Sequence, residues 1–214
     1  MNDSSHAADA AGNARREKKR LQRRQGILDA AEGVFAAHGF HEASIDKIAA
    51  AADYAPGTIY LYFKDKDALY TALFASKITR MVDLLEQAAA NATDPLQGLR
   101  AVIRAQFEFH DANREFFEVF QRHHRPPPSE DDEEWRTILA IIARHKAVLV
   151  GLIDKGRRRK ALRGGSSEDF ASALLGMIMH RTHESMHGPS PAQPLAPKAD
   201  FVFDLFLNGA RRSK

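Results

Sequence analysis

The chain of 214 residues is 44% hydrophobic, which is enough to bury the core of one large or two modest domains and excludes a disordered protein. Cysteine is absent, which excludes disulfides, thiolate metal sites and cysteine nucleophiles. No stretch approaches the roughly 20 apolar residues of a membrane-spanning helix, and the N-terminus lacks the apolar core of a signal peptide. We therefore expect a cytoplasmic protein that has no membrane partner.

The net charge of +3 is unevenly distributed along the chain. Residues 15–24 hold seven Lys or Arg and one Glu, a local charge of +6, so the other residues sum to about −3. We predict that residues 1–20 are a disordered basic tail. Such a tail can lie against DNA phosphates or enter a minor groove.

A helix is predicted from about Leu21 to His38. Its apolar face follows the helical spacing i, i+4, i+7, i+8 and i+11 through Ile27, Ala31, Val34, Phe35 and His38. Gly39 comes directly after the last periodic residue, where a helix commonly ends in the left-handed conformation that glycine adopts without strain. Phe40 can then fold back onto the end of the helix.

Residues 43–66 predict two short helices joined by a tight turn. Ser44 is a candidate N-cap for a first helix whose buried face carries Ile45, Ile48, Ala49 and Ala52. Residues 53–55 form the connection. Pro56 suits the first position of the second helix, where a backbone N–H is not needed.

The second short helix is predicted to turn Ile59 and Phe63 inward, because these residues are four apart. Thr58, Tyr60 and Tyr62 then lie on the remaining surface, although core packing of both tyrosines is the alternative. A helix, a short turn and a second helix at a steep angle is the geometry that presents a recognition helix to the major groove of DNA.

These residues form a pattern that resembles a known family. A helix ending in His38-Gly39-Phe40, then S-I-x-x-I-A, then P-G-T-I-Y-x-Y-F-K-x-K, is similar to the N-terminal DNA-binding domain of TetR-family transcriptional regulators. The resemblance covers about residues 22–75. It implies an all-α chain with a three-helix helix-turn-helix DNA-binding domain over residues 21–66 and a helical ligand-binding and dimerisation domain over residues 67–214.

The resemblance also implies a function and its partners. The chain is expected to be a homodimeric transcriptional regulator, and not an enzyme, that needs no cofactor. As a repressor it would leave double-stranded operator DNA when an unknown small-molecule effector binds the second domain. Two recognition helices about 34–36 Å apart predict a pseudo-palindromic operator.

The DNA-binding residues are expected in the pattern itself. Thr58, Tyr60, Tyr62 and Lys66 are predicted to contact phosphates or base edges, with Ser44 and Lys47 at the edge of the footprint. Lys66 takes its phosphate role from the resemblance and from its place in the first turn of the next helix, although an ordinary surface lysine is the alternative. Pro56 and Ala55 depart from the family, which has a basic or polar residue and a capping hydroxyl there, so base reading rests on fewer side chains.

Residues 67–214 predict further helices without a sequence signature of their own. Breaks are expected at residues 91–95, 126–134 and 188–197, and long helices at about residues 66–90, 96–110 and 133–160. The basic residues at 155–160 complement the C-terminal end of a helix dipole, although a second nucleic-acid site is the alternative. Asn113 is a candidate cap for a short helix.

The second domain is expected to hold the effector pocket and the dimer interface. Bulky apolar residues and one histidine are candidates for lining the pocket, although each is also compatible with the core: Phe107, His110, Phe116, Phe117, Phe120, Trp135, Ile142 and Met177. The last two helices are expected to pair with their copies in a second subunit, because Phe201 to Leu207 surround the final helix with apolar side chains.

His180, His183 and His187 follow the spacing i, i+3 and i+7 beside Glu184. Three imidazoles on one helical face could bind zinc or nickel, so a helical metal-binding protein or metal-responsive regulator is the competing hypothesis. Neutral histidines at the subunit seam or in the pocket are the preferred interpretation, and no metal or catalytic residue is expected.

Overall fold

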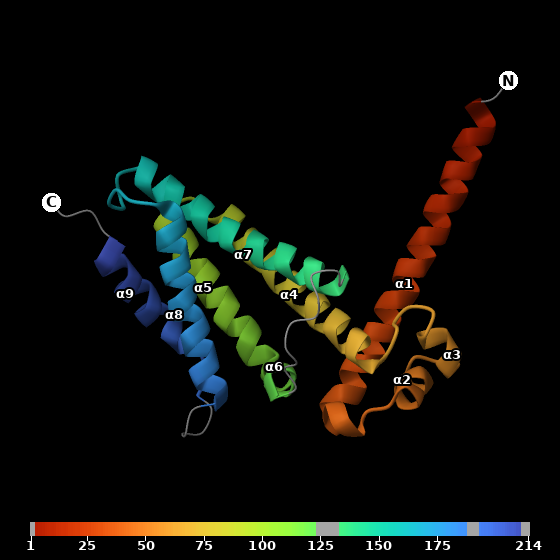
Figure 1. Cartoon of the computed structure of the whole chain (residues 1–214). Helices are drawn as coiled ribbons and strands as arrows, with labels where there is room; N and C mark the ends of the chain where they lie inside the picture. The colour runs from red at the N-terminus through yellow and green to blue at the C-terminus, as the bar shows by residue number, and fades with distance from the viewer. Residues whose placement is uncertain (1–2, 123–132, 188–192, 211–214) are drawn as a thin grey trace. The chain divides into compact units, whose positions relative to one another are not determined.

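The computed structural model describes residues 3–122, 133–187 and 193–210, with side chains over residues 12–119, 135–186 and 193–210 (Figure 1). The described chain is all-α, as predicted. Its elements in order are α1 (Asp3–Glu42), α2 (Ile45–Ala51), α3 (Pro56–Ile59), α4 (Lys66–Asn91), α5 (Pro95–Ala112), α6 (Arg114–Arg122), α7 (Glu133–Arg158), α8 (Ser167–His187), the 3₁₀ turn η1 (Ala196–Lys198) and α9 (Ala199–Ala210).

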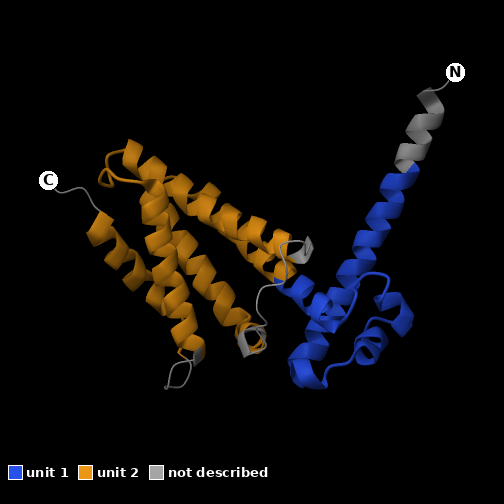
Figure 2. Ribbon diagram, viewed as in Figure 1, with its two compact units in different colours: residues 1–74 blue, residues 75–214 orange. Residues whose placement is uncertain are grey.

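The chain divides into two compact units, residues 1–74 and residues 75–214 (Figure 2). The division falls inside α4, so one continuous helix contributes to both units. The boundaries predicted at residues 20 and 66 stay predictions. Among the described residues, no helix is both long enough and apolar enough to cross a membrane.

The first unit packs α1 against α2, and α2 against α3. Its core is built from apolar residues of all four helices, and Phe35 lies at its centre, 2% exposed. The Phe35 ring stacks on Phe40 with centroids 5.8 Å apart and meets the edge of Tyr70 at 4.7 Å. Burial raises the pKa of the Tyr70 hydroxyl well above its usual value.

Gly39 ends the regular part of α1 in the predicted way. Its φ of 69° lies in the left-handed region, which a residue with a Cβ rarely adopts. The chain turns there and brings Phe40, 7% exposed, onto Phe35 and Tyr70. The sequence prediction of a glycine stop followed by a folded-back phenylalanine is confirmed.

Residues 3–20 are helical in the structure, unlike the predicted disordered tail. The segment is rich in Ala, Lys and Arg, which have high helix propensity, and contains no proline. Its described side chains from Asn13 to Gln22 are all exposed, so local propensity and not a packed core favours the helix.

The second unit is a helical bundle in which α5 packs against α7 and α9, α7 against α8, and α8 against α9. The buried side of α7 runs through Ile138, Ile141, His145, Leu149, Leu152 and Ile153. Leu139 and Ile142 lie outside this buried side, because their side chains are 48% and 51% exposed. Neighbouring apolar stripes fit the same helical period, and packing against α5 and α8 selects the one that includes His145.

Candidate DNA interface and effector region

The residues at the edge of the predicted DNA footprint organise the start of α2. The Ser44 hydroxyl accepts a hydrogen bond from the Lys47 backbone N–H at 3.2 Å, so Ser44 is the N-cap, as predicted. The Lys47 ammonium donates to the Glu42 carbonyl at 3.0 Å and its side chain is exposed. Both residues therefore order the α1–α2 corner while lying at the surface.

The turn between α2 and α3 depends on one residue with positive φ. Asp53 has a φ of 58°, a conformation that Asp tolerates better than most residues with a Cβ. The Tyr54 N–H then donates to the Ala49 carbonyl at 2.9 Å, which closes the turn. Ala55 precedes α3 without a side-chain cap, in line with the departure noted in the sequence.

The α3 segment buries one side and exposes the other. Ile59 and Phe63 are 0% and 3% exposed, which confirms their predicted inward direction. Helix-type hydrogen bonds continue beyond the end of α3, since the Phe63 N–H donates to the Ile59 carbonyl at 3.0 Å. Tyr60 is 57% exposed and Leu61 is 80% exposed. Tyr60 therefore lies outward as predicted, and Leu61 is an exposed residue that the sequence reasoning did not single out.

The other two predicted residues of this segment, Thr58 and Tyr62, are half-buried. The Thr58 carbonyl accepts the Leu61 N–H at 3.2 Å, and the Ile59 carbonyl accepts the Tyr62 N–H at 2.9 Å, so both belong to the same continuous turn. Periodicity counted from Ile59 and Phe63 alone could have found Leu61, because it lies on the opposite side of the helix.

Lys66 is engaged with the protein backbone. Its ammonium donates to the carbonyls of Phe40 at 2.8 Å, Ala43 at 2.9 Å and His41 at 3.4 Å, and lies 4.4 Å from the Phe40 ring centroid. These carbonyls follow the Gly39 break, where helical partners are lost. Lys66 thus ties the end of α1 to the start of α4. Its predicted contact with a phosphate stays a prediction.

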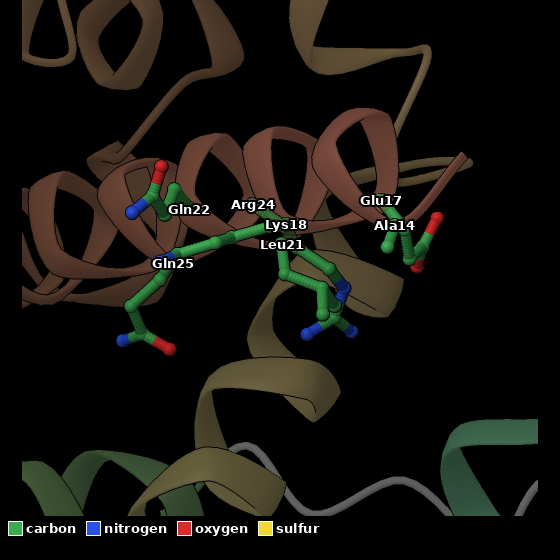
Figure 3. A pocket seen from close by; sticks show the side chains of 7 residues that line it. All are labelled: Ala14, Glu17, Lys18, Leu21, Gln22, Arg24 and Gln25. Atoms are coloured by element: carbon green, nitrogen blue, oxygen red, sulfur yellow. The ribbon is translucent and has the colours of Figure 1, made fainter. Parts of the chain in front are cut away.

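Arg24, in the basic run of α1, contacts the segment that continues α3. The Arg24 guanidinium lies 5.0 Å from the centroid of the Phe63 ring, a cation–π contact. Figure 3 shows a surface hollow whose lining comes from α1 alone, including Lys18, Leu21 and Gln25. A single helix cannot enclose a small molecule, so this hollow is not an effector site.

A buried polar cluster lies in the second unit, between α5 and α7. Gln106 is 0% exposed, and its side-chain oxygen is 3.0 Å from His145 Nε2. His110, one helical turn from Gln106, is also buried. Among the described residues, Gln106 Nε2 and His110 Nδ1 have no hydrogen-bond partner.

Both histidines of this cluster are held neutral. Burial, and to a smaller extent the neighbouring His145, lower the pKa of His110 to about 4, while Asp111 opposes the shift. Burial lowers the pKa of His145 to about 4 as well. The His110 ring lies 4.5 Å from the Phe117 ring, so this polar cluster borders the aromatic side chains of α5 and α6.

Asn113 does not cap α6 through its side chain, contrary to the prediction. Its amide oxygen accepts from the Lys77 ammonium at 2.8 Å, and its amide nitrogen donates to the Phe109 carbonyl at 2.8 Å. The side chain therefore points back toward α5 and α4. Long-range pairing with the buried Lys77 outweighs the local cap.

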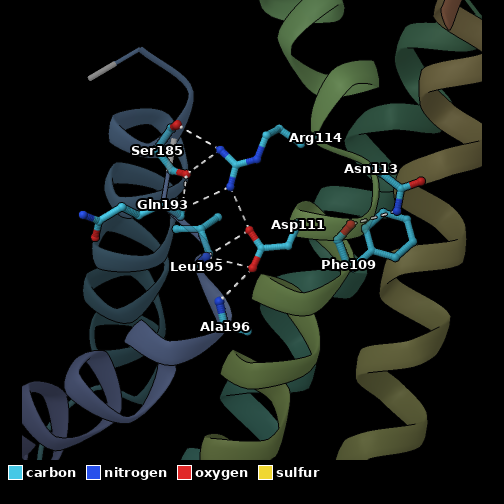
Figure 4. Close-up of polar contacts among 8 residues, drawn as sticks. All are labelled: Phe109, Asp111, Asn113, Arg114, Ser185, Gln193, Leu195 and Ala196. Carbon is cyan, nitrogen blue, oxygen red and sulfur yellow. Dashed lines mark hydrogen bonds and ion pairs between the residues drawn. The ribbon is translucent and has the colours of Figure 1, made fainter. Parts of the chain in front are cut away.

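The α5–α6 corner is joined to the segment that precedes α9 (Figure 4). The Asp111 carboxylate accepts the backbone N–H groups of Leu195 at 2.8 Å and Ala196 at 2.9 Å, and pairs with Arg114 at 2.9 Å. Arg114 also donates to the Ser185 hydroxyl and the Gln193 carbonyl at 2.9 and 3.1 Å. One carboxylate and one guanidinium thus connect α5, α6, α8 and η1.

The predicted pocket residues do not form one group. Phe107, His110 and Phe117 are buried together in α5 and α6, while Phe116, Trp135 and Met177 are half-buried. Ile142 is 51% exposed on α7 and does not line the buried side of that helix. The side chain of Phe120 lies outside the described residues. Gln106 and His145 are buried polar residues that the sequence reasoning left out of this region.

The histidine face of α8 is only partly described. His180 and His183 are exposed, and the side chain of His187 lies outside the described residues. In the part of the chain that the structure describes, no three His, Cys, Asp or Glu residues are grouped to hold a metal ion. Glu184 pairs with Arg181 on the same helix.

An apolar strip is exposed on the last two helices. Phe201 and Leu205, four apart on α9, are 60% and 54% exposed, and Met179 on α8 is 55% exposed. Gly176, three residues before Met179, is exposed, and an added Cβ would meet no atom within 4 Å. The α8 surface can therefore accept a closely packed neighbour.

Known proteins share both the sequence of the first unit and the fold. Residues 27–73 match the model for bacterial regulatory proteins of the tetR family. The fatty acid metabolism regulator protein of Bacillus subtilis (strain 168) is 37% identical over 81 residues, which cover 38% of this chain and 42% of that protein. The chain thus spans about half the length of the curated relatives it matches.

Solved structures extend the similarity to both units. The fatty acid degradation regulator FadR from Bacillus halodurans has a TM-score of 0.69 and 26% identity, covering 87% of this chain and 99% of that one. The regulator FadR from Bacillus subtilis in complex with stearoyl-CoA has the same fold, with a TM-score of 0.66, 23% identity and coverage of 86% and 98%. These relatives are transcriptional regulators and not enzymes.

Proposed function

This chain belongs to the TetR family of bacterial regulatory proteins, and we propose that it is a DNA-binding transcriptional regulator that reads double-stranded operator DNA with its first unit. The observation that carries the proposal is the two-sided α3 segment. Ile59 and Phe63 are fully packed inside, so Tyr60 and Leu61 are held outward on a rigid support. The basic run of α1 in the same unit supplies attraction to phosphates.

The proposed regulator acts as a homodimer through α8 and α9. Phe201, Leu205 and Met179 are large apolar side chains that one protomer leaves more than half exposed. A second copy would cover them, and the exposed Gly176 would allow the helices to approach closely. A two-fold dimer presents two recognition segments, so the operator is pseudo-palindromic with half-sites about 34–36 Å apart.

The proposed effector is a long-chain fatty acyl-CoA. Three named relatives regulate fatty acid metabolism or degradation or bind stearoyl-CoA. The second unit has an aromatic core at Phe107, Phe109 and Phe117 that suits an acyl chain. Beside it lie the unpartnered Gln106 Nε2 and His110 Nδ1, which can hydrogen-bond a ligand carbonyl.

The proposed regulator is a repressor that the effector releases from DNA. The effector can release DNA only if it binds the released arrangement of the dimer more tightly than the DNA-binding arrangement. The Asp111–Arg114 pair connects the α5–α6 corner to the segment that enters α9, so a change at this corner reaches the helices proposed to form the dimer. The effector would favour a dimer in which the distance between the two recognition segments does not match the distance between the operator half-sites.

A mobility-shift assay against DNA from the protein's own genomic neighbourhood tests the DNA-binding proposal. Tyr60→Ala is expected to weaken binding about tenfold, a loss of about 1.4 kcal/mol for one lost base or phosphate contact. Leu139→Ala, which changes an exposed residue of the second unit, is the matched control and should bind normally. Lys66→Ala is a poor probe, because it also removes three backbone contacts. Equal binding by wild type and Tyr60→Ala would contradict the proposal.

The effector proposal needs its own titration. Stearoyl-CoA is expected to raise the melting temperature and to release DNA, whereas free coenzyme A and free stearate at equal concentration should do neither. A reporter placed behind the operator distinguishes repression from activation. Stearoyl-CoA that neither stabilises the protein nor changes DNA binding would rule out this effector class and leave the DNA-binding proposal standing.

A further inference from the structure

Leu61 is the most exposed of the large apolar residues among the described side chains, at 80%. It lies midway between the buried Ile59 and Phe63, two residues from each, so packing of these two side chains turns Leu61 outward. The Leu61 N–H donates to the Thr58 carbonyl at 3.2 Å, which keeps the residue within the helical turn. Together with the exposed Tyr60, Leu61 places two large, mainly apolar side chains on the outer side of the segment that is proposed to meet DNA.

The residues around Leu61 define the kind of partner. Gly57, Tyr60 and Leu61 follow the helical spacing i, i+3 and i+4, and all three are exposed. Lys64, also exposed, comes directly after the last helix-type hydrogen bond of this segment, which the Phe63 N–H donates. A Cβ added at Gly57 would meet no atom within 4 Å, so this end of the face is open to close approach. Lys64 supplies a positive charge at the other end, and the basic run of α1 lies in the same unit.

This face carries few hydrogen-bonding groups for reading base edges. Pro56, Gly57 and Leu61 offer no polar side-chain atom. Among these residues and Tyr60, the Tyr60 hydroxyl is the one neutral side-chain donor. In the major groove, the feature that an apolar side chain distinguishes is the C5 methyl group of thymine. Positive charge beside an exposed leucine therefore fits DNA better than an apolar protein surface.

We propose that Leu61 is a specificity-determining residue that recognises the C5 methyl group of a thymine in each operator half-site, so that the operator is read largely by apolar contact. This inference rests on the proposed DNA-binding function and deepens it. The positive residues of the unit would fix the protein on the phosphates, and Leu61 would select the sequence.

The test removes the methyl group alone. An operator is first selected from random-sequence duplexes with the wild-type protein, and each thymine is then replaced singly by deoxyuridine. Burial of one methyl group corresponds to about a fourfold change in affinity, so wild type should lose about fourfold at one thymine position of each half-site. Leu61→Ala should bind the thymine operator about tenfold more weakly and lose its sensitivity to deoxyuridine at that position.

Two further variants keep the result interpretable. Leu61→Met retains an apolar side chain of similar size and should keep the deoxyuridine penalty. Leu139→Ala, an exposed leucine of the second unit, should match wild type in affinity and in the penalty. Because Leu61 makes little contact with the core, near-ultraviolet circular dichroism of Leu61→Ala should match that of wild type.

The outcomes separate the inference from the function on which it rests. An equal deoxyuridine penalty in wild type and Leu61→Ala would overturn the methyl-reading role alone. Normal DNA affinity of Leu61→Ala would overturn it too, and would assign the exposed leucine to a protein partner or a second copy. Failure of wild type to select any sequence would overturn both this inference and the proposed function.

Discussion

The two units differ in what they bury. In the described part of residues 1–74, the buried side chains are apolar or aromatic, with the Tyr70 hydroxyl as the polar exception. The described part of residues 75–214 buries six polar or charged side chains: Lys77, Gln106, His110, His145, Ser167 and Thr182. Lys77, Ser167 and Thr182 are hydrogen-bonded, so the cost of burying polar groups falls on the unpartnered Gln106 Nε2 and His110 Nδ1.

This difference matches where each unit meets its proposed ligand. The first unit would meet DNA on its outer surface, so its interior needs only to hold α3 rigidly. The second unit would meet a small molecule inside, where polar atoms such as Gln106 Nε2 and His110 Nδ1 can be satisfied by the ligand. The unit with buried polar side chains is thus the one proposed to bind its ligand inside. The unit with the apolar interior is the one proposed to bind DNA on its surface.

Intrinsic spectroscopic probes separate the two units. All four tyrosines, Tyr54, Tyr60, Tyr62 and Tyr70, belong to residues 1–74, and the single tryptophan, Trp135, belongs to residues 75–214. Selective excitation of Trp135 reports unfolding of the second unit, and near-ultraviolet tyrosine bands report chiefly on the first. The stability of each unit can therefore be followed separately.

The largest expected effect is acid sensitivity of the second unit. His110 and His145 have folded-state pKa values of about 4 against an ordinary 6.5, so between these values the unfolded chain binds protons that the folded chain does not. Stability therefore falls as the pH drops from about 6.5 toward 4, by about 3 kcal/mol per histidine at most. Urea unfolding followed by Trp135 fluorescence at several pH values measures this slope.

Two variants sharpen the acid prediction. His110→Phe should reduce the pH slope by about half, because one of the two neutral histidines is lost. His38→Gln, which changes an exposed histidine of the first unit, should leave the slope unchanged. A Trp135-detected stability that does not change across this range would contradict the buried, neutral state of both rings.

The next effect comes from Asp111→Asn. The substitution removes the charge of the carboxylate, which accepts hydrogen bonds from the N–H groups of Leu195 and Ala196 and pairs with Arg114. The free energy of unfolding of the second unit is therefore expected to fall by about 2 kcal/mol. Asp200→Asn is the matched control. Its pairs with Arg100 and Arg104 are about half exposed, and its loss should stay within about 1 kcal/mol. Equal losses of stability in the two variants would show that the Asp111 contacts stabilise the second unit no more than the exposed Asp200 pairs do.

The smallest effect concerns Lys66 in the first unit. Lys66→Met keeps much of the side-chain volume but removes the ammonium that three carbonyls share, so the tyrosine-detected stability should fall by about 1–2 kcal/mol. Lys64→Met, at an exposed neighbouring position, should leave stability within about 0.5 kcal/mol. If Lys66→Met weakens DNA binding without loss of stability, the phosphate role predicted from the sequence outweighs the backbone role.

The predictable part of the structure was the part governed by local rules. Ser44 as an N-cap, Gly39 as a stop with positive φ, and Ile59 with Phe63 as an inward pair all follow from residue type and spacing. Leu61 was missed because an apolar residue in a helix is ordinarily assigned to the core. Its exposure is decided by Ile59 and Phe63, which already fill the inward side.

The α7 stripe shows the limit of periodicity. Leu139 and Ile142 fit an apolar helical face as well as Ile138 and Ile141 do, and nothing local favours placing His145 inside. Packing against α5 decides the rotation of the helix, because Gln106 there offers His145 a buried partner at 3.0 Å. Asn113 follows the same rule, since Lys77, 36 residues earlier, takes the side chain from its local cap.

The sequence by itself determined the helical class, the Ser44 cap, the Gly39 stop and the family that the first unit matches, because these depend on residues within a few positions of one another. Only the tertiary structure decided that Lys66 binds the end of α1 and that Gln106, His110 and His145 share one buried cluster. These features join residues that are distant in the chain, and chain spacing carries no information about which helix faces meet.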